Sequence, residues 1–446
     1  MMEKLKFKSR WGFIIACVGS AVGMANVWGF PYKVGANGGG AFLLCYLLFI
    51  MIFSYTGLSS EYAIGRRAKT GTLGAYQYAW KTKNKEKIGK IIGWIPLIGT
   101  MTIAIGYSVI ISYVFKALVD SLSGMLMTAN PEQWFASFAF KNYSVIPYHI
   151  FVVIFTMITV LFGVRSIEKT NKIIMPLFFI LFLILAIRVF FMPNAIEGYK
   201  FMFTPDWKHL INPMTWIWAM GQAFFSLSIT GSGMIVYGSY LGEEVDILNG
   251  AKNTALFDTL AALVAALVMI PAAFAFNLDQ SSGPGLLFNT LPKVLQNIHL
   301  GRIFAVILYT AVLFGGVSSM QNMLEAVTES ITYKIKGANR KLVLLLLCIV
   351  VLSVGVFMEP IAETKGAILG GWGPWMDLVS IYVIPIGAAM GAFSWFWVWK
   401  KEEIIEEINK GSSKKIGKLW YFVGRWIYTP LAIILCLIAL IYKISF

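Results

Sequence analysis

The sequence GSAVGMAN at residues 19–26 interrupts an apolar stretch that carries no charge between Arg10 and Lys33. Such a stretch is long enough to span a bilayer, which takes about 20 apolar residues. Glycine and asparagine at membrane depth predict unwound backbone, which is tolerated there only where protein encloses its polar groups or where they line a cavity. The stretch therefore predicts a broken membrane helix whose break lines a binding site, as in a transporter.

The composition of the chain indicates an integral membrane protein. Of its 446 residues, 58% are hydrophobic and 13% are charged, whereas soluble proteins carry about 25% charged residues. The net charge of +15 does not indicate nucleic-acid binding, because the lysines cluster in short segments between apolar spans. The four cysteines lie within apolar spans without ligand spacing, which predicts neither disulfides nor a metal site. We find no nucleophile–base set or cofactor motif typical of an enzyme.

Spans of membrane-crossing length recur along the whole chain. We predict about eleven transmembrane helices in a single all-α domain, 1–446, near residues 11–34, 41–64, 88–121, 149–164, 172–192, 213–241, 252–277, 302–334, 341–358, 374–400 and 421–444. The segments rich in lysine and arginine, such as 66–90 and 400–418, all fall on one side, which is therefore predicted to be cytoplasmic. The N-terminus then lies inside and the C-terminus outside a bacterial-type cytoplasmic membrane.

The sixth span repeats the interruption of the first. Its centre reads SLSITGSG at residues 226–233, and no charge lies between Trp216 and Tyr240. Two interrupted spans, five spans apart, are typical of inverted-repeat transporters, whose site lies at the repeat interface. We therefore predict a 5+5 inverted repeat (about 11–192 and 213–400) with discontinuous helices 1 and 6 and an extra helix at 421–444. The half-helix ends would offer N–H groups to a carboxylate and carbonyls to a cation.

Several motifs resemble those of the neurotransmitter:sodium symporter family. They are GSAVGMANVWGFPY at 19–32, NGGGAF at 37–42, EYAIGR at 61–66, GQAFFSLS at 221–228 and GPGL at 283–286. The resemblance covers essentially the whole chain, and the chain is similar to the shorter, eleven-span bacterial form with its LeuT-type fold. It implies a sodium-coupled symporter that imports an amino acid by alternating access. The implied partners are that amino acid and the lipid bilayer, without nucleic acid.

The resemblance also implies positions for the site residues. The substrate would bind at the first break and at the third, sixth and eighth spans, through Ser20, Ala21, Gly23, Met24, Ala25, Ile103, Tyr107, Phe225, Ser226, Ser228, Ser319 and Met323. Two sodium ions are implied, the first held by Ala21, Asn26, Ser226 and Asp258 and the second by Gly19, Val22, Gly315, Ser318 and Ser319. Oxygen ligands of this kind suit a hard cation. The loop at 283–285 would fold over the outer vestibule as a lid.

Three positions refine the expected substrate and ion dependence. Gly23 stands where the family's monoamine carriers have an aspartate, so the substrate must bring its own carboxylate, which favours amino acids. The apolar walls favour a hydrophobic side chain, and Gly231 would leave room for a larger, aromatic one. Asp258 stands where chloride-dependent members have a neutral residue, and a carboxylate within a span is usually functional. We therefore expect transport that does not require chloride.

The gates depart from the family's pattern. Gly29 stands in place of an arginine that would pair with Asp377, and Lys33, one helical turn later, is the candidate replacement. On the inner side Tyr333 stands in place of an aspartate. The candidates for the inner gate are Lys4 and Glu329.

Other interpretations are open at the level of sequence. Glycines and serines in membrane spans often serve close helix packing, and Glu61 can be structural or a snorkelling charge. A sensor on the same fold would bind an amino acid without transporting it. A channel-like conductor would carry currents far above its solute flux. The sequence carries no signal for the oligomeric state, the sodium stoichiometry or proton counter-transport.

Overall fold

The computed structural model describes residues 6–280, 283, 285–360, 370–412 and 415–445. Within these residues, seven helical segments are long and apolar enough to cross a membrane: Gly40–Ala68, Glu86–Ser123, Val164–Phe190, Ile247–Ala275, Gly301–Lys334, Trp372–Val398 and Lys418–Tyr442. The pair Arg10–Ala21 and Ala25–Ala36 forms one further span, bent by 59° at its break. Three shorter segments correspond to the remaining predicted spans: α11 (Ile146–Val160), α15 with α16 (Pro213–Ser226, Gly233–Ser239) and α20 (Arg340–Val356).

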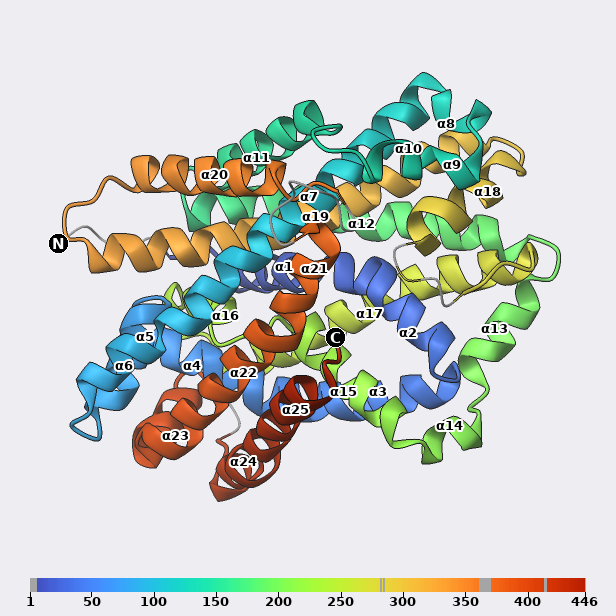
Figure 1. The fold of residues 1–446 in the computed structure, drawn as a ribbon. Coiled ribbons are helices and arrows are strands. Elements are labelled where there is room, and N and C mark those ends of the chain that lie inside the picture. The colour runs from blue at the N-terminus through green and yellow to red at the C-terminus, as the bar shows by residue number, and fades with distance from the viewer. Residues whose placement is uncertain (1–5, 281–282, 284, 361–369, 413–414, 446) are drawn as a thin grey trace.

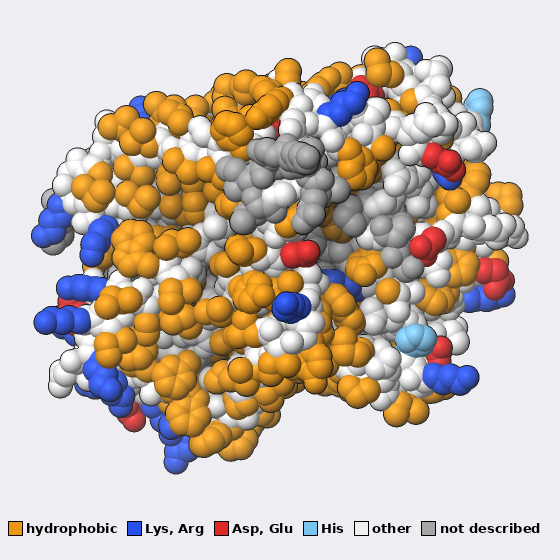
Figure 2. Space-filling model, viewed as in Figure 1, with side chains coloured by type: hydrophobic (Ala, Val, Ile, Leu, Met, Phe, Trp, Pro, Cys, Tyr) orange, Lys and Arg blue, Asp and Glu red, His pale blue; other side chains and the backbone are white. Residues whose placement is uncertain are grey.

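The spans run between two opposite ends of the molecule (Figure 1). One end carries α5 (Thr72–Lys81), α6 (Glu86–Ile92) and α23 (Lys401–Asn409). The other carries α13 (Ala195–Phe203) and α14 (Trp207–Ile211). Lysine and arginine side chains gather at the first end in Figure 2, and we call it the basic end. A broad hydrophobic surface lies between the ends, as a bilayer requires.

Both predicted helix breaks are present. α1 (Arg10–Ala21) is followed by Val22 in an extended conformation, and the helix resumes at Ala25 with a π-helical turn that leads into α2 (Phe30–Ala36). α15 ends at Ser226 and α16 begins at Gly233. The fold is therefore all-helical with discontinuous first and sixth spans, and the boundaries of the two repeats remain a prediction.

The two broken helices lie in the middle of the bundle. α1 packs against α12 (Val164–Phe190), α17 (Ile247–Ala275) and α19 (Gly301–Lys334), and α16 packs against α4 (Ser59–Ala68) and α19. α7 (Trp94–Ser123) packs along α19. Polar side chains with no exposed surface gather at the breaks, among them Asn26, Ser226, Asp258 and Ser318. A buried polar group is costly without a partner. The polar groups gathered here therefore indicate a binding site in this interior.

Candidate functional site

Side chains from other helices replace the backbone hydrogen bonds that the first break removes. The Ser319 hydroxyl lies 3.1 Å from the carbonyl of Val22 and 3.2 Å from that of Ser20. The Ser228 hydroxyl, from the second break, also reaches the Ser20 carbonyl at 3.3 Å. No side chain caps the helical segment that begins after Met24. The N–H groups of Asn26 and Val27 donate to the Gly23 carbonyl at 3.1 and 3.2 Å, which leaves the N–H groups of Met24 and Ala25 to face an anionic ligand group.

One cluster of oxygen atoms joins the first break to α17. Asn26 Nδ2 donates to Asp258 Oδ1 at 2.7 Å, and the Ser226 hydroxyl donates to Asp258 Oδ2 at 2.7 Å. The Tyr46 hydroxyl donates to Ser226 Oγ at 3.3 Å. In the described part of the chain the buried carboxylate of Asp258 forms no ion pair, which is unfavourable unless a cation accompanies it. The residues fit a small hard cation, and the amide oxygen of Asn26, which here accepts from the Gly23 N–H at 3.1 Å, would have to turn toward that ion.

A second cluster lies between α1 and α19. The Ser318 hydroxyl donates to the Gly315 carbonyl at 2.9 Å and lies 3.5 Å from the Val22 carbonyl. A Cβ on Gly315 would lie 3.7 Å from the same Val22 oxygen, so the two backbones approach closely. The structure thus places Val22 against Gly315, Ser318 and Ser319 of the predicted set. Its oxygen-only character suits a monovalent cation.

Asn171 of α12 borders the second cluster, and sequence reasoning missed it. A Cβ on Gly19 would lie 2.6 Å from Asn171 Oδ1. That buried oxygen has no hydrogen-bond partner among the described residues, while Asn171 Nδ2 donates to Gln321 Oε1 at 3.1 Å. The sequence predicts a fifth span from residue 172, which places this asparagine in the loop before it. In the structure α12 begins at Val164.

A small cavity of about 30 Å³ lies beside the two clusters. The predicted substrate residues on its wall are Ser20, Ala21, Ala25, Ile103, Tyr107, Phe225, Ser228, Ser319 and Met323, and those missed from the sequence are Thr100, Thr230, Gly233 and Asn322. Thr100 and Asn322 each lie one helical turn from a predicted residue, so helical spacing could have found them. Of the other predicted residues, Gly23 abuts Ser319 and Tyr107, Met24 lines the vestibule described below and Ser226 belongs to the first cluster.

The cavity wall carries no charged side chain among the described residues. Its volume of about 30 Å³ leaves room for only about two water molecules, which need roughly 10–15 Å³ each on this measure. An amino acid therefore needs side chains of the wall to move. Phe225 and Met323 are only partly buried, and methionine adapts its shape easily.

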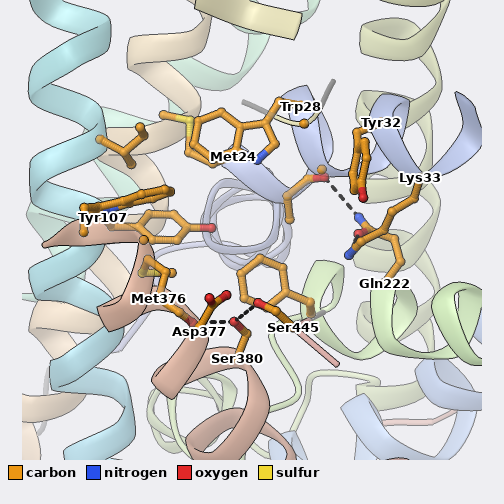
Figure 3. Close-up of a pocket in the computed structure, with 17 residues that line it drawn as sticks. Met24, Trp28, Tyr32, Lys33, Tyr107, Gln222, Met376, Asp377, Ser380 and Ser445 are labelled. Carbon is orange, nitrogen blue, oxygen red and sulfur yellow. Dashed lines mark hydrogen bonds between the residues drawn. The ribbon is translucent and has the colours of Figure 1, made fainter. Parts of the chain in front are cut away.

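A larger cavity of about 540 Å³, the vestibule, lies next to the small one (Figure 3). Ala25, Tyr107 and Phe225 line both cavities, so the two rings stand between them. Lys33 and Gln222 lie on one side of the vestibule and Asp377 on the other (Figure 3). Gly283 also lines it. Residues 281, 282 and 284 lie outside the described residues, so the lid remains a prediction.

The predicted gate pair of Lys33 and Asp377 is not formed in this structure. Lys33 Nζ donates to Gln222 Oε1 at 2.8 Å, and Gln222 Nε2 in turn donates to the Ala25 carbonyl at 3.0 Å. No ion pair between the described residues joins Lys33 to Asp377. The side chain of Lys33 is instead tied to the backbone of the first break through Gln222.

The basic end is closed by polar contacts. Glu325 of α19 accepts from Arg340 of α20 and from the Tyr240 hydroxyl. The backbone N–H of Lys8 donates to Glu168 of α12 at 2.9 Å. The molecule is thus held closed at this end while the vestibule contacts the central site from the other side, a geometry that one state of an alternating-access transporter requires.

Of the two inner-gate candidates, only Glu329 lies among the described residues. Glu329 accepts from the N–H of Gly71 at 2.7 Å and from the Thr70 hydroxyl at 3.3 Å, which ties α19 to the turn before α5. Lys4 lies outside the described residues. Their gate roles remain predictions.

The prediction that Gly231 leaves room for a larger substrate is wrong. A Cβ there would lie 2.6 Å from the Tyr76 hydroxyl and 2.7 Å from the Gly387 carbonyl, so protein atoms already fill this space. Its φ of +75° is a left-handed conformation that glycine adopts without strain. Its N–H donates to Glu61 Oε1 at 2.8 Å. The glycine is therefore needed for the second break, and Glu61 stabilises that break.

The chain is similar to a known protein family, to two transporters and to one solved structure. Residues 4–146 and 136–445 match the model of the sodium:neurotransmitter symporter family. The chain is 31% identical to an uncharacterized sodium-dependent transporter of Bacillus subtilis, over 100% of this chain and 99% of that protein. It is 29% identical to another of Methanocaldococcus jannaschii, over 95% and 88%. The crystal structure of MhsT in complex with L-phenylalanine is similar, with a TM-score of 0.87 and 31% identity over 98% of this chain and 100% of that one.

Proposed function

The chain belongs to the sodium:neurotransmitter symporter family, and we propose that it imports neutral, hydrophobic amino acids together with sodium by alternating access. It is a multi-pass membrane transporter and not an enzyme. The observation that carries the proposed substrate class is the uncharged wall of the central cavity, which lies at the ends of two broken helices. A charged side chain of a substrate would find no counter-charge there.

The broken helices suit the two charges of an amino acid. Its carboxylate is placed at the uncapped N–H groups near Met24 and Ala25, where the helix dipole favours negative charge. A Cβ on Gly23 would lie 2.4 Å from Ser319 Oγ and 3.6 Å from the Tyr107 hydroxyl, so a larger residue would intrude on this position. The apolar wall, with Ile103 and Phe225, favours a hydrophobic side chain, and the phenylalanine bound by MhsT supports the same class.

Two sodium ions are assigned to the two oxygen clusters. The first ion would neutralise Asp258 and lie near the substrate's carboxylate, and the second would be bound by carbonyl oxygens of the first break. Asp258 supplies the negative charge that balances the first cation, so we propose transport without a chloride requirement. The basic end is assigned to the cytoplasm, because positively charged loops stay inside, and the vestibule then opens outward with the N-terminus inside and the C-terminus outside. Sodium entry supplies about 2.3 kcal/mol per ion for each 100 mV of potential.

Equilibrium binding of tritiated phenylalanine to the purified transporter tests the substrate class. We expect saturable binding in sodium that disappears in potassium and is displaced by leucine and tryptophan but not by lysine or glutamate. Displacement by the charged amino acids to the same extent would contradict the proposal.

A further inference from the structure

A second large cavity, of about 560 Å³, lies at the basic end. Four segments that are distant in the sequence meet around it: the residues before α1, the end of α4, the start of α12 and the residues after α16. They contribute Lys6, Lys8, Arg66, Lys69, Arg165, Ser239, Leu241, Gly242 and Glu243. We call it the basic cavity, because five of these residues are cationic and one is anionic.

The positive charge of the basic cavity is largely unbalanced. Arg66 is neutralised by Glu407 at 2.7 Å, and Glu243 already lies 3.5 Å from Lys410. Among the described residues, the side chains of Lys6, Lys69 and Arg165 form no hydrogen bond or ion pair. The side chain of Lys8 forms none either, and only its backbone N–H is engaged. Like charges around one cavity repel each other and produce a potential that attracts an anion.

We propose that the basic cavity binds a phosphate group, carried by an anionic lipid headgroup or by free inorganic phosphate. The several oxygens of a phosphate can accept from more than one cation at once, and an arginine can donate to two of them. Basic pockets between membrane helices on the cytoplasmic side suit such headgroups. Ser239 also lines the cavity, and its hydroxyl, which donates to the Val236 carbonyl at 2.7 Å in this structure, would have to turn to donate to the phosphate.

The bound phosphate would link the parts that must separate when the basic end opens. Lys6 and Lys8 precede α1, Ser239 ends α16, and Arg165 lies at the start of α12. α1 and α16 carry the two halves of the central site. A ligand that binds all three segments at once stabilises the closed state by the difference between its affinities for the closed and the open arrangements. This effect on the transport cycle rests on the proposed function, whereas phosphate binding itself rests only on the cavity.

The first experiment measures binding to the full-length transporter in neutral detergent. Native mass spectrometry counts bound phosphatidylglycerol, and isothermal titration measures inorganic phosphate. The test variant is K69Q/R165Q, and the control is K83Q/K87Q, which removes two exposed cations of the same end that do not line the cavity. We expect K69Q/R165Q to weaken binding at least tenfold and the control to leave it unchanged.

Each outcome of this experiment either supports or overturns phosphate binding in the basic cavity. A lipid adduct without phosphate binding assigns the site to a headgroup, phosphate binding without a lipid adduct assigns it to the free anion, and binding of both ligands assigns it to the phosphate group itself. No binding by either ligand, or an equal loss in the two double variants, overturns the proposal. Thermal unfolding of both variants confirms that they are folded.

The second experiment measures sodium-dependent binding of phenylalanine in phosphatidylcholine vesicles with and without phosphatidylglycerol. We expect the anionic lipid to increase affinity severalfold in the wild type and in K83Q/K87Q but not in K69Q/R165Q. An equal increase in all three would refute the link to the closed state. If phenylalanine binds to none of the three proteins in either kind of vesicle, the proposed function fails. The lipid and phosphate measurements then still test whether the basic cavity binds a phosphate group.

Discussion

At the residue scale, the charge of the first cation cluster depends on Asp258. Its carboxylate is fully buried and accepts from Asn26 and Ser226. The net charge of the substrate–cation complex therefore changes by one unit if this side chain becomes neutral. If that negative charge is missing, an external anion such as chloride would be needed to balance the cation.

We predict that Asp258→Asn lowers sodium-dependent uptake more than tenfold and makes the remaining uptake respond to chloride. The asparagine keeps the size of the side chain but removes the charge that balances the cation. Uptake in chloride and in gluconate, at a fixed sodium gradient, measures both effects. An asparagine variant with normal uptake and no response to chloride would rule out the assigned role.

The size of the substrate is predicted to depend on Met323. This side chain lines the central cavity, which is too small for an amino acid as it stands. Met323→Ala should improve the affinity for tryptophan relative to leucine by about tenfold, since a few methylene groups in an apolar pocket are worth about 1–3 kcal/mol. Competition against tritiated phenylalanine measures the ratio. Met323→Leu, close in volume, serves as the control, and an unchanged ratio in the alanine variant would contradict the assignment.

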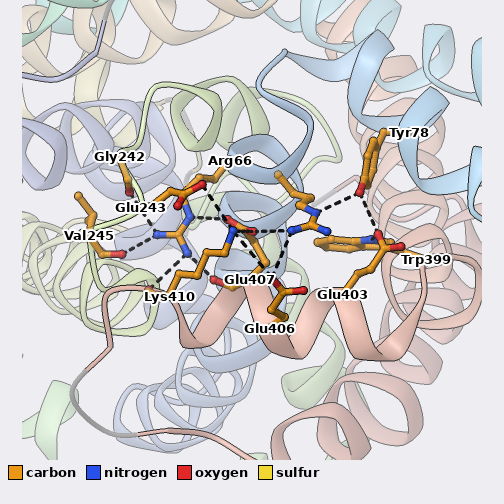
Figure 4. Close-up of polar contacts among 11 residues, drawn as sticks. Arg66, Tyr78, Gly242, Glu243, Val245, Trp399, Glu403, Glu406, Glu407 and Lys410 are labelled. Carbon is orange, nitrogen blue, oxygen red and sulfur yellow. Dashed lines mark hydrogen bonds and ion pairs between the residues drawn. The ribbon is translucent and has the colours of Figure 1, made fainter.

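At the scale of elements, α23 is clamped onto the end of α4 (Figure 4). The buried guanidinium of Arg66 pairs with Glu407 at 2.7 Å and donates to the Val245 carbonyl at 2.6 Å. It also donates to the carbonyls of Gly242 and Glu407. One side chain thereby joins α4, the segment after α16 and α23, and its own buried charge is paired with Glu407.

Glu407→Gln should destabilise the folded transporter by about 3 kcal/mol, because it leaves Arg66 buried without its counter-charge. Thermal unfolding in detergent measures the change. Glu406→Gln is the matched control, since its side chain is 58% exposed and its nearest cation lies 3.6 Å away. We expect it to cost less than about 1 kcal/mol, and an equal cost for the two variants would show that burial of the pair is unimportant.

Most of the helices and their breaks can be predicted from the sequence, whereas the contacts between the helices cannot. Apolar length and the glycine–serine clusters predict the spans and both breaks, because bilayer thickness and backbone satisfaction are local constraints. The partner of Lys33 depends on which side chain from α15 reaches it, and Gln222 gives no signal in the sequence. The environment of Gly231 is likewise made by Tyr76 and Gly387, which are far away in the chain. Asn171 escapes sequence reasoning because a polar residue at the edge of a span looks like a loop.

At the scale of the whole molecule, the structure is closed at the basic end and hollowed by the vestibule on the other side of the central site. Polar contacts at the basic end must break before a solute can leave there. Glu325 with Arg340 and Glu168 with the backbone of Lys8 are two of the contacts there that join separate spans. The sodium gradient sets the direction of net transport, and the orientation of the two ends determines which side of the membrane the vestibule faces.

Cysteine labelling tests that orientation. A cysteine at Lys87, an exposed position of the basic end, should react with an impermeant maleimide only in inside-out vesicles. One at Glu132, exposed in the segment between the third and fourth spans, should react only in right-side-out cells. The native cysteines that serve as background are all buried. The reverse pattern would place the N-terminus outside.

The measurement that tests the central claim most directly is uptake of radiolabelled phenylalanine by proteoliposomes under an inward sodium gradient. We predict accumulation above the external concentration, which is abolished when potassium replaces sodium and unchanged when gluconate replaces chloride. Binding without accumulation would identify a sensor, and sodium currents far above the amino-acid flux would identify a conductor. Either of these results would contradict coupled transport.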